Sequence, residues 1–390
     1  MGPSGSIPIQ PFRADDWWTS KASLLMGFVY LFALWFHISF ERFLPLALFS
    51  ILVIAGFASF GYLSNDFFDK EKDRLAGKKN FLLDKPLFYQ IGLAIVSISL
   101  IVMPWFFLPA AALSYWLIGI QLSLFLLYSC PPIRLKEKGA AGVLVDSLYA
   151  HAVPTILAAY TFFLASFFFL PYIAFVLLFL WQLLSGIRNI LIHQLEDKSS
   201  DTSSGTKTFA GTSNTKSILQ ILQAVILLEL AFCLAFFSLL TFREHQFAVC
   251  IAAVFLLCFQ SIFWYIHLTL EDLPDPPLRY FPNNVYEKWL PAIYLILLSF
   301  SNGYFLILLF LHITLFNFDL YRSSIRTASD IRKGLPIGYI HYTVVLPIRI
   351  FISKVVNHTI YYSLLIVGID LKKEQMSALD YFRKKRGNNR

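Results

Sequence analysis

Long apolar runs are the feature that most constrains the fold of this chain. They occur near residues 22–40, 43–63, 87–109, 110–130, 146–168, 172–192, 217–241, 246–270 and 289–317. A helix of about 20 predominantly apolar residues can cross the hydrocarbon core of a bilayer. The chain is 57% hydrophobic and only 14% charged, whereas soluble proteins average about 25% charged residues. We therefore predict an all-α, polytopic membrane protein with about nine transmembrane helices, and we exclude an ordinary soluble domain.

Basic residues gather in alternate loops between these runs. The segment 70–85 holds six Lys and Arg residues, and the segments 134–138 and 198–216 hold three each. The loops near 104–114 and 166–171 hold none. Because Lys and Arg are enriched in cytoplasmic loops, we predict a multi-pass integral membrane protein whose N-terminus and basic loops lie in the cytoplasm.

The last 72 residues differ from the rest of the chain. Two apolar stretches, near 336–352 and 355–370, are short or interrupted by charged residues. Such segments could form a tenth span, a re-entrant segment or an amphipathic helix at the membrane interface, and the interrupting charges favour the last two. We expect residues 1–318 to form an intramembrane domain and residues 319–390 to form a C-terminal extension.

Acidic residues mark the predicted cytoplasmic end of the second run, where the chain reads Asn65-Asp66-Phe-Phe-Asp69-Lys-Glu-Lys-Asp73. Asn65, Asp69 and Asp73 are spaced four apart, so a helix would carry them on one stripe. Asp66 would face about 100° away from Asn65, either as a further metal ligand or as a helix-end charge. The spacing predicts a row of oxygen ligands along one helix face.

The same spacing occurs at the end of the sixth run, with Asn189, His193, Asp197 and Asp201. Like charges one turn apart destabilise a bare helix, so a repeated pattern at one membrane face indicates a ligand. Carboxylate and amide oxygens suit Mg²⁺, which combines them with phosphate oxygens of a substrate. We predict that the two stripes hold Mg²⁺ ions that bridge a diphosphate.

These motifs resemble those of the UbiA superfamily of intramembrane prenyltransferases. Residues 65–73 match its N-D-x-x-D-x-x-x-D motif and residues 197–201 its D-x-x-x-D motif, while the segment 128–136 is similar to its Y-S-x-P-x-R-x-K loop. The N-terminal segment from Arg13 is also similar, although Ala14 replaces the family's proline. The resemblance, over residues 10–315, implies a helix bundle with a cavity open to the cytoplasm. There a polyprenyl diphosphate would lose pyrophosphate, and an acceptor would attack the resulting allylic carbocation.

The charges and the resemblance together nominate the site residues. The catalytic candidates are Asp69, Asp73, Asp197, Asp201 and His193. The candidate metal ligands are Asn65, Asp66, Asp69, Asp73, Asn189, Asp197 and Asp201. The candidate substrate-binding cations are Lys72, Arg74, Arg134, Lys136, Lys207, Arg13 and Lys21.

Three ionisable residues each have two interpretations. His193 lies one turn before Asp197 and is either a proton acceptor or only a hydrogen-bond partner of Asn189 or Asp197. Asp146 and His151 lie near the start of the fifth run. Ionisable residues inside a membrane are functional candidates, but a satisfied polar contact explains these two equally well.

Other functions remain open at this point. A terpene cyclase, or a glycosyl-type transferase that uses a polyprenyl phosphate, would share the fold. A cation transporter is disfavoured, because an ion path needs charges near the middle of the bilayer and the Asp residues cluster at one face. The sequence identifies neither the acceptor nor the prenyl chain length, and it indicates no nucleic-acid partner.

Overall fold

The computed structural model of the protein describes residues 13–75, 77, 80–166, 172–199, 201, 206–255 and 280–316. The chain divides into two units, Met1–Gly334 and Leu335–Arg390, and every described residue belongs to the first. The expected extension at 319–390 therefore lies outside the described residues, and the domain boundary at residue 318 stays a prediction.

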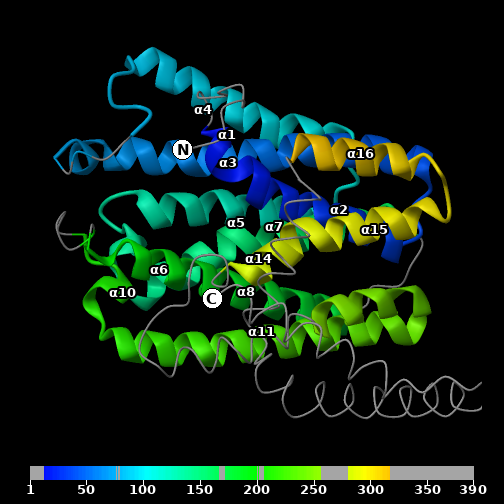
Figure 1. The fold of residues 1–390 in the computed structure, drawn as a ribbon. Helices are drawn as coiled ribbons and strands as arrows, with labels where there is room; N and C mark the ends of the chain where they lie inside the picture. The colour runs from blue at the N-terminus through cyan, green and yellow to red at the C-terminus, as the bar shows by residue number, and fades with distance from the viewer. Residues whose placement is uncertain are drawn as a thin grey trace, which may run out of the picture. The chain divides into compact units, whose positions relative to one another are not determined.

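The described residues form helices and no strands, which confirms the all-α fold class (Figure 1). The elements are α1 (Ala14–Trp17), η2 (Trp18–Ala22), α2 (Ser23–Trp35), α3 (Phe40–Leu75), α4 (Leu87–Val102), η3 (Met103–Phe106), α5 (Ala112–Ser129), η4 (Leu135–Glu137), α6 (Ala140–Ser147), η5 (Leu148–Ala152), α7 (Val153–Leu164), α8 (Tyr172–Glu196), α10 (Phe209–Thr212), α11 (Thr215–Arg243), η6 (His245–Phe247), α14 (Phe281–Asn284), η7 (Val285–Trp289), α15 (Leu290–Ser299) and α16 (Phe305–Leu315).

Within the part of the chain that the structure describes, six helices are long and apolar enough to cross a membrane, by length and composition. They are Phe40–Leu75, Leu87–Phe106, Ala112–Ser129, Ala140–Leu164, Tyr172–Glu196 and Thr215–Arg243. These six correspond to the second to seventh apolar runs, and they make the chain an integral membrane protein.

The remaining three runs differ from the predicted spans. The first run contains α2, a helix of 13 residues, and only the part up to residue 255 of the eighth run is described. The prediction of one span over 289–317 is wrong, because a turn at 300–304 separates α15 from α16. Asn302 Oδ1 accepts a hydrogen bond from the Tyr304 backbone N–H at 3.0 Å, a local turn that competes with helix. The count of nine spans stays a prediction.

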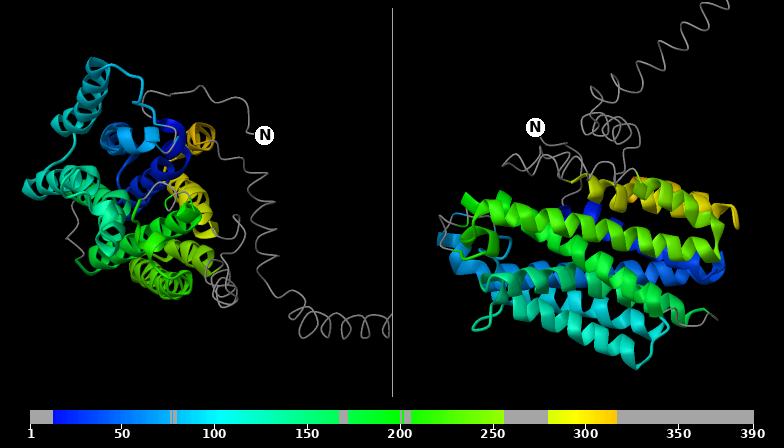
Figure 2. Two further views of the ribbon diagram at one scale, coloured as in Figure 1. Left: turned by 90° about the vertical axis from the view of Figure 1, so that its left-hand side faces the viewer. Right: turned by 90° about the horizontal axis from the view of Figure 1, so that it is seen from below.

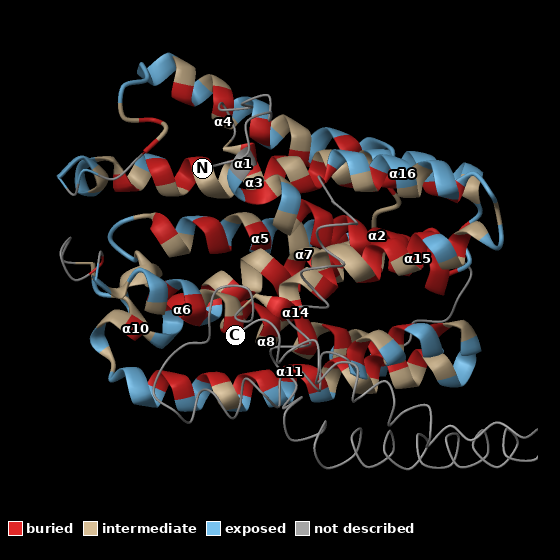
Figure 3. Cartoon of the chain, viewed as in Figure 1, coloured by how far each residue is buried: buried red, intermediate tan, exposed pale blue. Residues whose placement is uncertain are grey.

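Helix α2 lies at the centre of the bundle. All of its residues from Ser23 to Trp35 are buried, and it packs against α7 and α15 (Figure 3). By contrast, α4 and α5 expose large apolar side chains such as Phe88 and Trp116. Because apolar side chains on a spanning helix can face lipid tails, we interpret the outer faces of α4 and α5 as lipid-facing.

Two glycines let helices approach closely around this core. A Cβ at Gly56 of α3 would lie 2.8 Å from the Ile101 backbone nitrogen of α4. A Cβ at Gly186 of α8 would lie 2.7 Å from the Ser147 Cα at the end of α6. Small residues of this kind are typical of helix contacts in membranes, and here they fix the neighbours of both motif-bearing helices.

The helices run side by side, as the end-on view of Figure 2 shows. The C-terminal end of α3 and the short helix α10, which follows α8 in the chain, lie at the same end of the bundle (left in Figure 1). The two acidic motifs are therefore brought to one end, as their positions in the sequence predict.

Candidate active site

An acidic cavity of about 370 Å³ lies between the ends of α3 and α8. It is lined by Arg13, Asn65, Asp66, Asp69, Lys72, Asp73, Tyr128, Arg134, Lys136, Ile190, His193, Gln194, Asp197, Asp201, Thr206 and Thr208. Five carboxylates and four Lys or Arg side chains thus border one space. The structure brings together both acidic motifs, which are more than 100 residues apart in the chain.

Two cations from the loop after α5 hold Asp69, which lies on the α3 wall of the cavity. Arg134 Nη2 donates to Asp69 Oδ1 at 2.5 Å, and Lys136 forms an ion pair with Asp69 Oδ2. Lys136 Nζ also donates to Asn65 Oδ1 at 3.0 Å. Burial lowers the pKa of Lys136 below its ordinary value, although the Asp69 carboxylate opposes this effect. A loop that follows α5 therefore places its charges directly on the first motif.

Asp66 and Asp73 have partners elsewhere. Arg13 Nη1 donates to Asp66 Oδ1 at 2.5 Å, and the Asp66 side chain is only 2% exposed. Asn80 Nδ2 donates to Asp73 Oδ2 and to the Asp66 backbone oxygen, both at 2.8 Å. The bond from Arg13 to Asp66 therefore links the N-terminal segment to α3. Asp66 can make this bond because it faces away from the stripe of Asn65, Asp69 and Asp73.

The second motif forms the opposite wall. Backbone hydrogen bonds join Asp197 N to His193 O at 2.9 Å and Asp201 N to Asp197 O at 2.8 Å. These bonds confirm the helical spacing of four among the three residues. Thr208 Oγ1 donates to Asp201 Oδ2 at 3.2 Å, so the chain folds back against its own motif.

Asn189 and His193 behave differently from the aspartates. Asn189 does not line the cavity; its Oδ1 accepts from Arg188 and its Nδ2 contacts His151 Nε2 at 3.3 Å. Arg188 is fully buried and bonded through Nε to Glu229 Oε2 at 2.7 Å. His193 borders the cavity but its side chain is 61% exposed, with Nδ1 at 3.7 Å from Glu196. The proposed ligand role of Asn189 lacks support from this placement.

Not all of the nominated cations reach the cavity. Lys72 and Arg134 both pair with Glu137 there, but Arg74 and Lys207 are exposed and do not line it. Lys21 lies instead in the neighbouring apolar pocket. Sequence reasoning did not nominate Tyr128, Glu137 or Asn80. The first two lie in or beside the 128–136 motif, whereas nothing in the sequence indicates Asn80.

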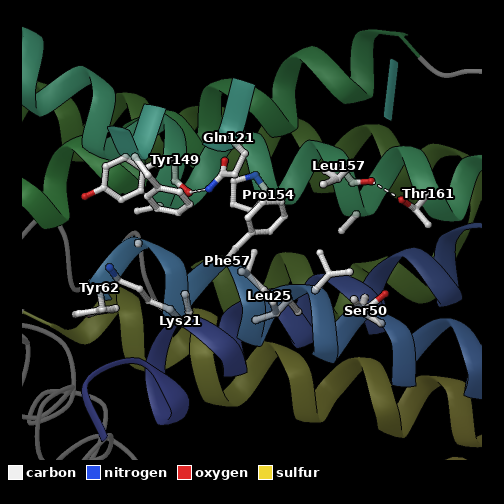
Figure 4. Close-up of a pocket in the computed structure, with 18 of the residues that line it drawn as sticks. Lys21, Leu25, Ser50, Phe57, Tyr62, Gln121, Tyr149, Pro154, Leu157 and Thr161 are labelled. Carbon is white, nitrogen blue, oxygen red and sulfur yellow. Dashed lines mark hydrogen bonds between the residues drawn. The ribbon is translucent and has the colours of Figure 1, made fainter. Parts of the chain in front are cut away.

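An apolar pocket of about 280 Å³ adjoins the acidic cavity (Figure 4). Its wall comes mainly from aliphatic and aromatic side chains of α2, α3, α5 and α7, such as Val53, Phe57 and Leu157. Asn65 and Tyr128 line both spaces. The site is therefore a charged compartment joined to an apolar one inside the bundle.

The donor set fits magnesium. All candidate ligands that line the cavity offer carboxylate or amide oxygens, the atoms that Mg²⁺ prefers. Among the described residues no group of three acidic, His or Cys side chains converges closely enough to hold an ion alone. Mg²⁺ usually takes one or two carboxylates and completes its shell with water and substrate phosphates. A diphosphate between the two walls would supply those phosphate oxygens.

Comparison with known proteins decides the family. The model of the UbiA prenyltransferase family matches residues 23–284, more than half of the 390-residue chain. The chain belongs to the UbiA prenyltransferase family. The resemblance inferred from the motifs is thereby confirmed, and no curated protein matches the chain.

Solved structures share the UbiA fold at low sequence identity. A UbiA homolog from Archaeoglobus fulgidus bound to GPP and Mg²⁺ has a TM-score of 0.55 at 16% identity, covering 75% of this chain and 100% of that chain. The same homolog bound to DMAPP and Mg²⁺ has a TM-score of 0.54 at 15% identity, covering 75% and 99%. The apo structure of a UbiA homolog from Aeropyrum pernix K1 has a TM-score of 0.53 at 15% identity, covering 72% and 97%. These likenesses establish the fold.

Proposed function

We propose that this UbiA family member transfers a prenyl group from a polyprenyl diphosphate to an acceptor within the membrane, with release of pyrophosphate and dependence on Mg²⁺. One observation carries the proposal: the acidic cavity and the apolar pocket meet at Asn65 and Tyr128. A prenyl diphosphate is a charged head on an apolar chain, and this pair of spaces matches both parts.

We assign the metal site to the oxygens that border the acidic cavity, namely those of Asn65, Asp69, Asp73, Asp197 and Asp201. The homologs bound to DMAPP or GPP together with Mg²⁺ support the use of a divalent metal with a prenyl diphosphate. Bound Mg²⁺ would neutralise charge on the diphosphate and so make it a better leaving group.

Arg134 and Lys136 serve the same leaving group. Both line the acidic cavity, where each forms an ion pair with Asp69. A guanidinium donates two parallel hydrogen bonds to phosphate oxygens, and an ammonium acts as a point charge. They therefore balance part of the negative charge that the pyrophosphate carries away.

The apolar pocket serves the prenyl chain and the carbocation. Phe57, Phe125 and Tyr149 line it, and the faces of aromatic rings attract cations. Their bulk also excludes water, which would otherwise capture the cation. Because basic loops emerge at the end of the bundle that holds the acidic cavity, we propose that the site opens to the cytoplasm.

The test uses the full chain in lipid nanodiscs with radiolabelled geranyl diphosphate. We expect pyrophosphate release with Mg²⁺, loss of release with EDTA, and recovery when Mg²⁺ is restored in excess. The mass of the product, with and without added acceptors, separates a transferase from a cyclase. Equal release in EDTA, or no Mg²⁺-dependent binding of geranyl diphosphate, would contradict the proposal.

A further inference from the structure

The apolar pocket is polar at one end. Lys21 and Tyr62 lie on one wall there, and Gln121 and Tyr149 lie on the opposite wall (Figure 4). The other end of the pocket holds Leu157 together with the small neutral hydroxyl groups of Ser50 and Thr161, so the ammonium, phenol and amide groups distinguish the first end. Burying polar groups costs free energy, so such groups are not expected in a pocket that binds only a hydrocarbon chain.

Asp146 is the carboxylate of this polar end. It lines the pocket from α6, and the Tyr149 hydroxyl donates to its Oδ1. Lys21 interacts with it electrostatically, and the Lys21 ammonium lies 5.3 Å from the centre of the Tyr62 ring. A buried charge persists only when it is paired and hydrogen-bonded. The Tyr149 hydroxyl thus holds one carboxylate oxygen of Asp146 at the edge of an apolar chamber.

Gln121 carries a hydrogen-bond acceptor that has no donor among the described residues. The residue is only 1% exposed, and its Nε2 donates to the Tyr149 backbone oxygen at 2.6 Å. Its Oε1 is buried and has no hydrogen-bond partner among the described residues. Leaving a buried polar atom unpaired costs about 1–3 kcal/mol. A bound molecule that donates a hydrogen bond to this oxygen would remove that cost.

The polar end lies next to the reaction centre of the proposed function. Tyr128, which borders both spaces, has its ring centre 5.3 Å from that of Tyr149. Tyr62 precedes Asn65 by one helical turn of α3. The reacting carbon of a prenyl diphosphate would lie where the head meets the chain, at this same junction.

We propose that the polar end binds a neutral, hydroxyl-bearing acceptor, an alcohol or a phenol, and that Asp146 is the base that takes its proton. The inference rests on the proposed prenyl transfer. The C1–O bond of the prenyl diphosphate breaks, and its electron pair leaves with pyrophosphate. The acceptor oxygen forms the new bond to C1, and its proton passes to the Asp146 carboxylate. Gln121 Oε1 accepts a hydrogen bond from a second donor group of the acceptor.

Neutral acceptors are favoured by the charges of the pocket. Asp146 would repel a carboxylate or phosphate group, and the Lys21 ammonium lies over the ring of Tyr62. His193 is a weaker candidate for the base, because it borders the acidic cavity and not this pocket. Asp146 therefore combines the two properties that the step needs, a basic oxygen and access to the chamber.

The test compares matched acceptors and matched variants in nanodiscs with geranyl diphosphate and Mg²⁺. Hydroquinone, phenol and 1-octanol serve as hydroxyl acceptors, and their fully methylated ethers serve as controls of similar shape in which no hydroxyl proton remains. We expect Asp146→Asn, which keeps the size of the side chain, to lower kcat for the hydroxyl acceptors by about 10²–10⁴-fold. Gln121→Met should raise KM for hydroquinone about fivefold while kcat changes little.

Geranyl diphosphate binding in the presence of Mg²⁺ separates this inference from the proposed function. Binding by Asp146→Asn should equal that of the wild type, and Asp84→Asn, the same change at an exposed carboxylate outside both cavities, should leave transfer unchanged. If the wild type binds geranyl diphosphate but forms no product with any hydroxyl acceptor, the inference fails and prenyl transfer stands. Wild-type turnover in Asp146→Asn, or equal product yield with the ethers, would also overturn it. Absence of binding by the wild type would instead refute the proposed function itself.

Discussion

The two acidic stripes have the same spacing in the sequence but different surroundings in the fold. The α3 stripe consists of Asn65, Asp69 and Asp73, and the α8 stripe of Asn189, His193, Asp197 and Asp201. Protein cations from a distant loop reach the α3 stripe at Asp69. On the α8 stripe, the neutral hydroxyl of Thr208 donates to Asp201. The comparison teaches that spacing places ligands on one face, whereas the charge around them depends on other segments.

The first residue of each stripe shows the same contrast. Asn65 lies at the junction of the two spaces and accepts from Lys136 Nζ at 3.0 Å. Asn189 belongs to a buried polar group with Arg188 and His151, which does not border the acidic cavity. The two asparagines are each the first residue of a stripe, yet they are expected to have different roles.

The largest expected effect tests whether both stripes act on the same ligand. Asp69→Ala and Asp197→Ala should each lower turnover of geranyl diphosphate by at least about 10²–10³-fold, because each removes a charged oxygen from one wall. Turnover measured at saturating Mg²⁺ checks this, with Asp84→Ala as the control. Near-normal turnover in either variant would show that one stripe alone suffices.

The sequence correctly predicts the class of fold and the convergence of the two acidic motifs, but not the contacts around them. Apolar runs identify spanning helices because a bilayer demands length and composition, and a four-residue repeat places carboxylates on one helix face. The turn near Asn302 was missed because only the short segment Ser301-Asn302-Gly303 separates two strongly apolar stretches. The contact of Asn80 with Asp73 and the displacement of Lys21 into the apolar pocket depend on how distant segments pack, which no local spacing encodes.

A smaller effect is expected from the two asparagines, and it sharpens their contrast. Asn65→Ala should lower turnover about 10–100-fold, less than the loss of an aspartate, because the oxygen that it removes from the metal site is neutral and also accepts from Lys136. Asn189→Ala should leave turnover nearly unchanged and lower the free energy of unfolding by about 1 kcal/mol through lost hydrogen bonds. Turnover and unfolding of both variants should be measured together. Equal losses of turnover in Asn65→Ala and Asn189→Ala would indicate that Asn189 also belongs to the metal site.

The smallest effect is expected at His193, the member of the α8 stripe with two open interpretations. Its side chain is 61% exposed, and its Nδ1 lies 3.7 Å from Glu196 Oε2. Its ring centre lies 6.0 Å from that of Tyr280, with the two ring planes tilted by 42°. A base that takes a proton next to a carbocation needs a site that excludes water. The His193 side chain is too exposed to solvent for that role. His193→Gln keeps a hydrogen-bonding side chain but removes the titratable nitrogen. We therefore expect turnover to fall less than tenfold, below the ~10²–10⁴ contribution of a positioned base.

The matched comparison for this last change is the further variant His193→Ala, measured for turnover and for its dependence on Mg²⁺ concentration. If the His193 side chain only positions Asp197, which lies one turn further along, the His193→Ala variant should need a higher Mg²⁺ concentration than His193→Gln for half-maximal turnover. A fall of more than about 10²-fold in Gln, at saturating Mg²⁺ and with unchanged geranyl diphosphate binding, would make His193 the base. The α8 stripe would then supply the proton acceptor as well as metal ligands, and the α3 stripe would supply ligands only.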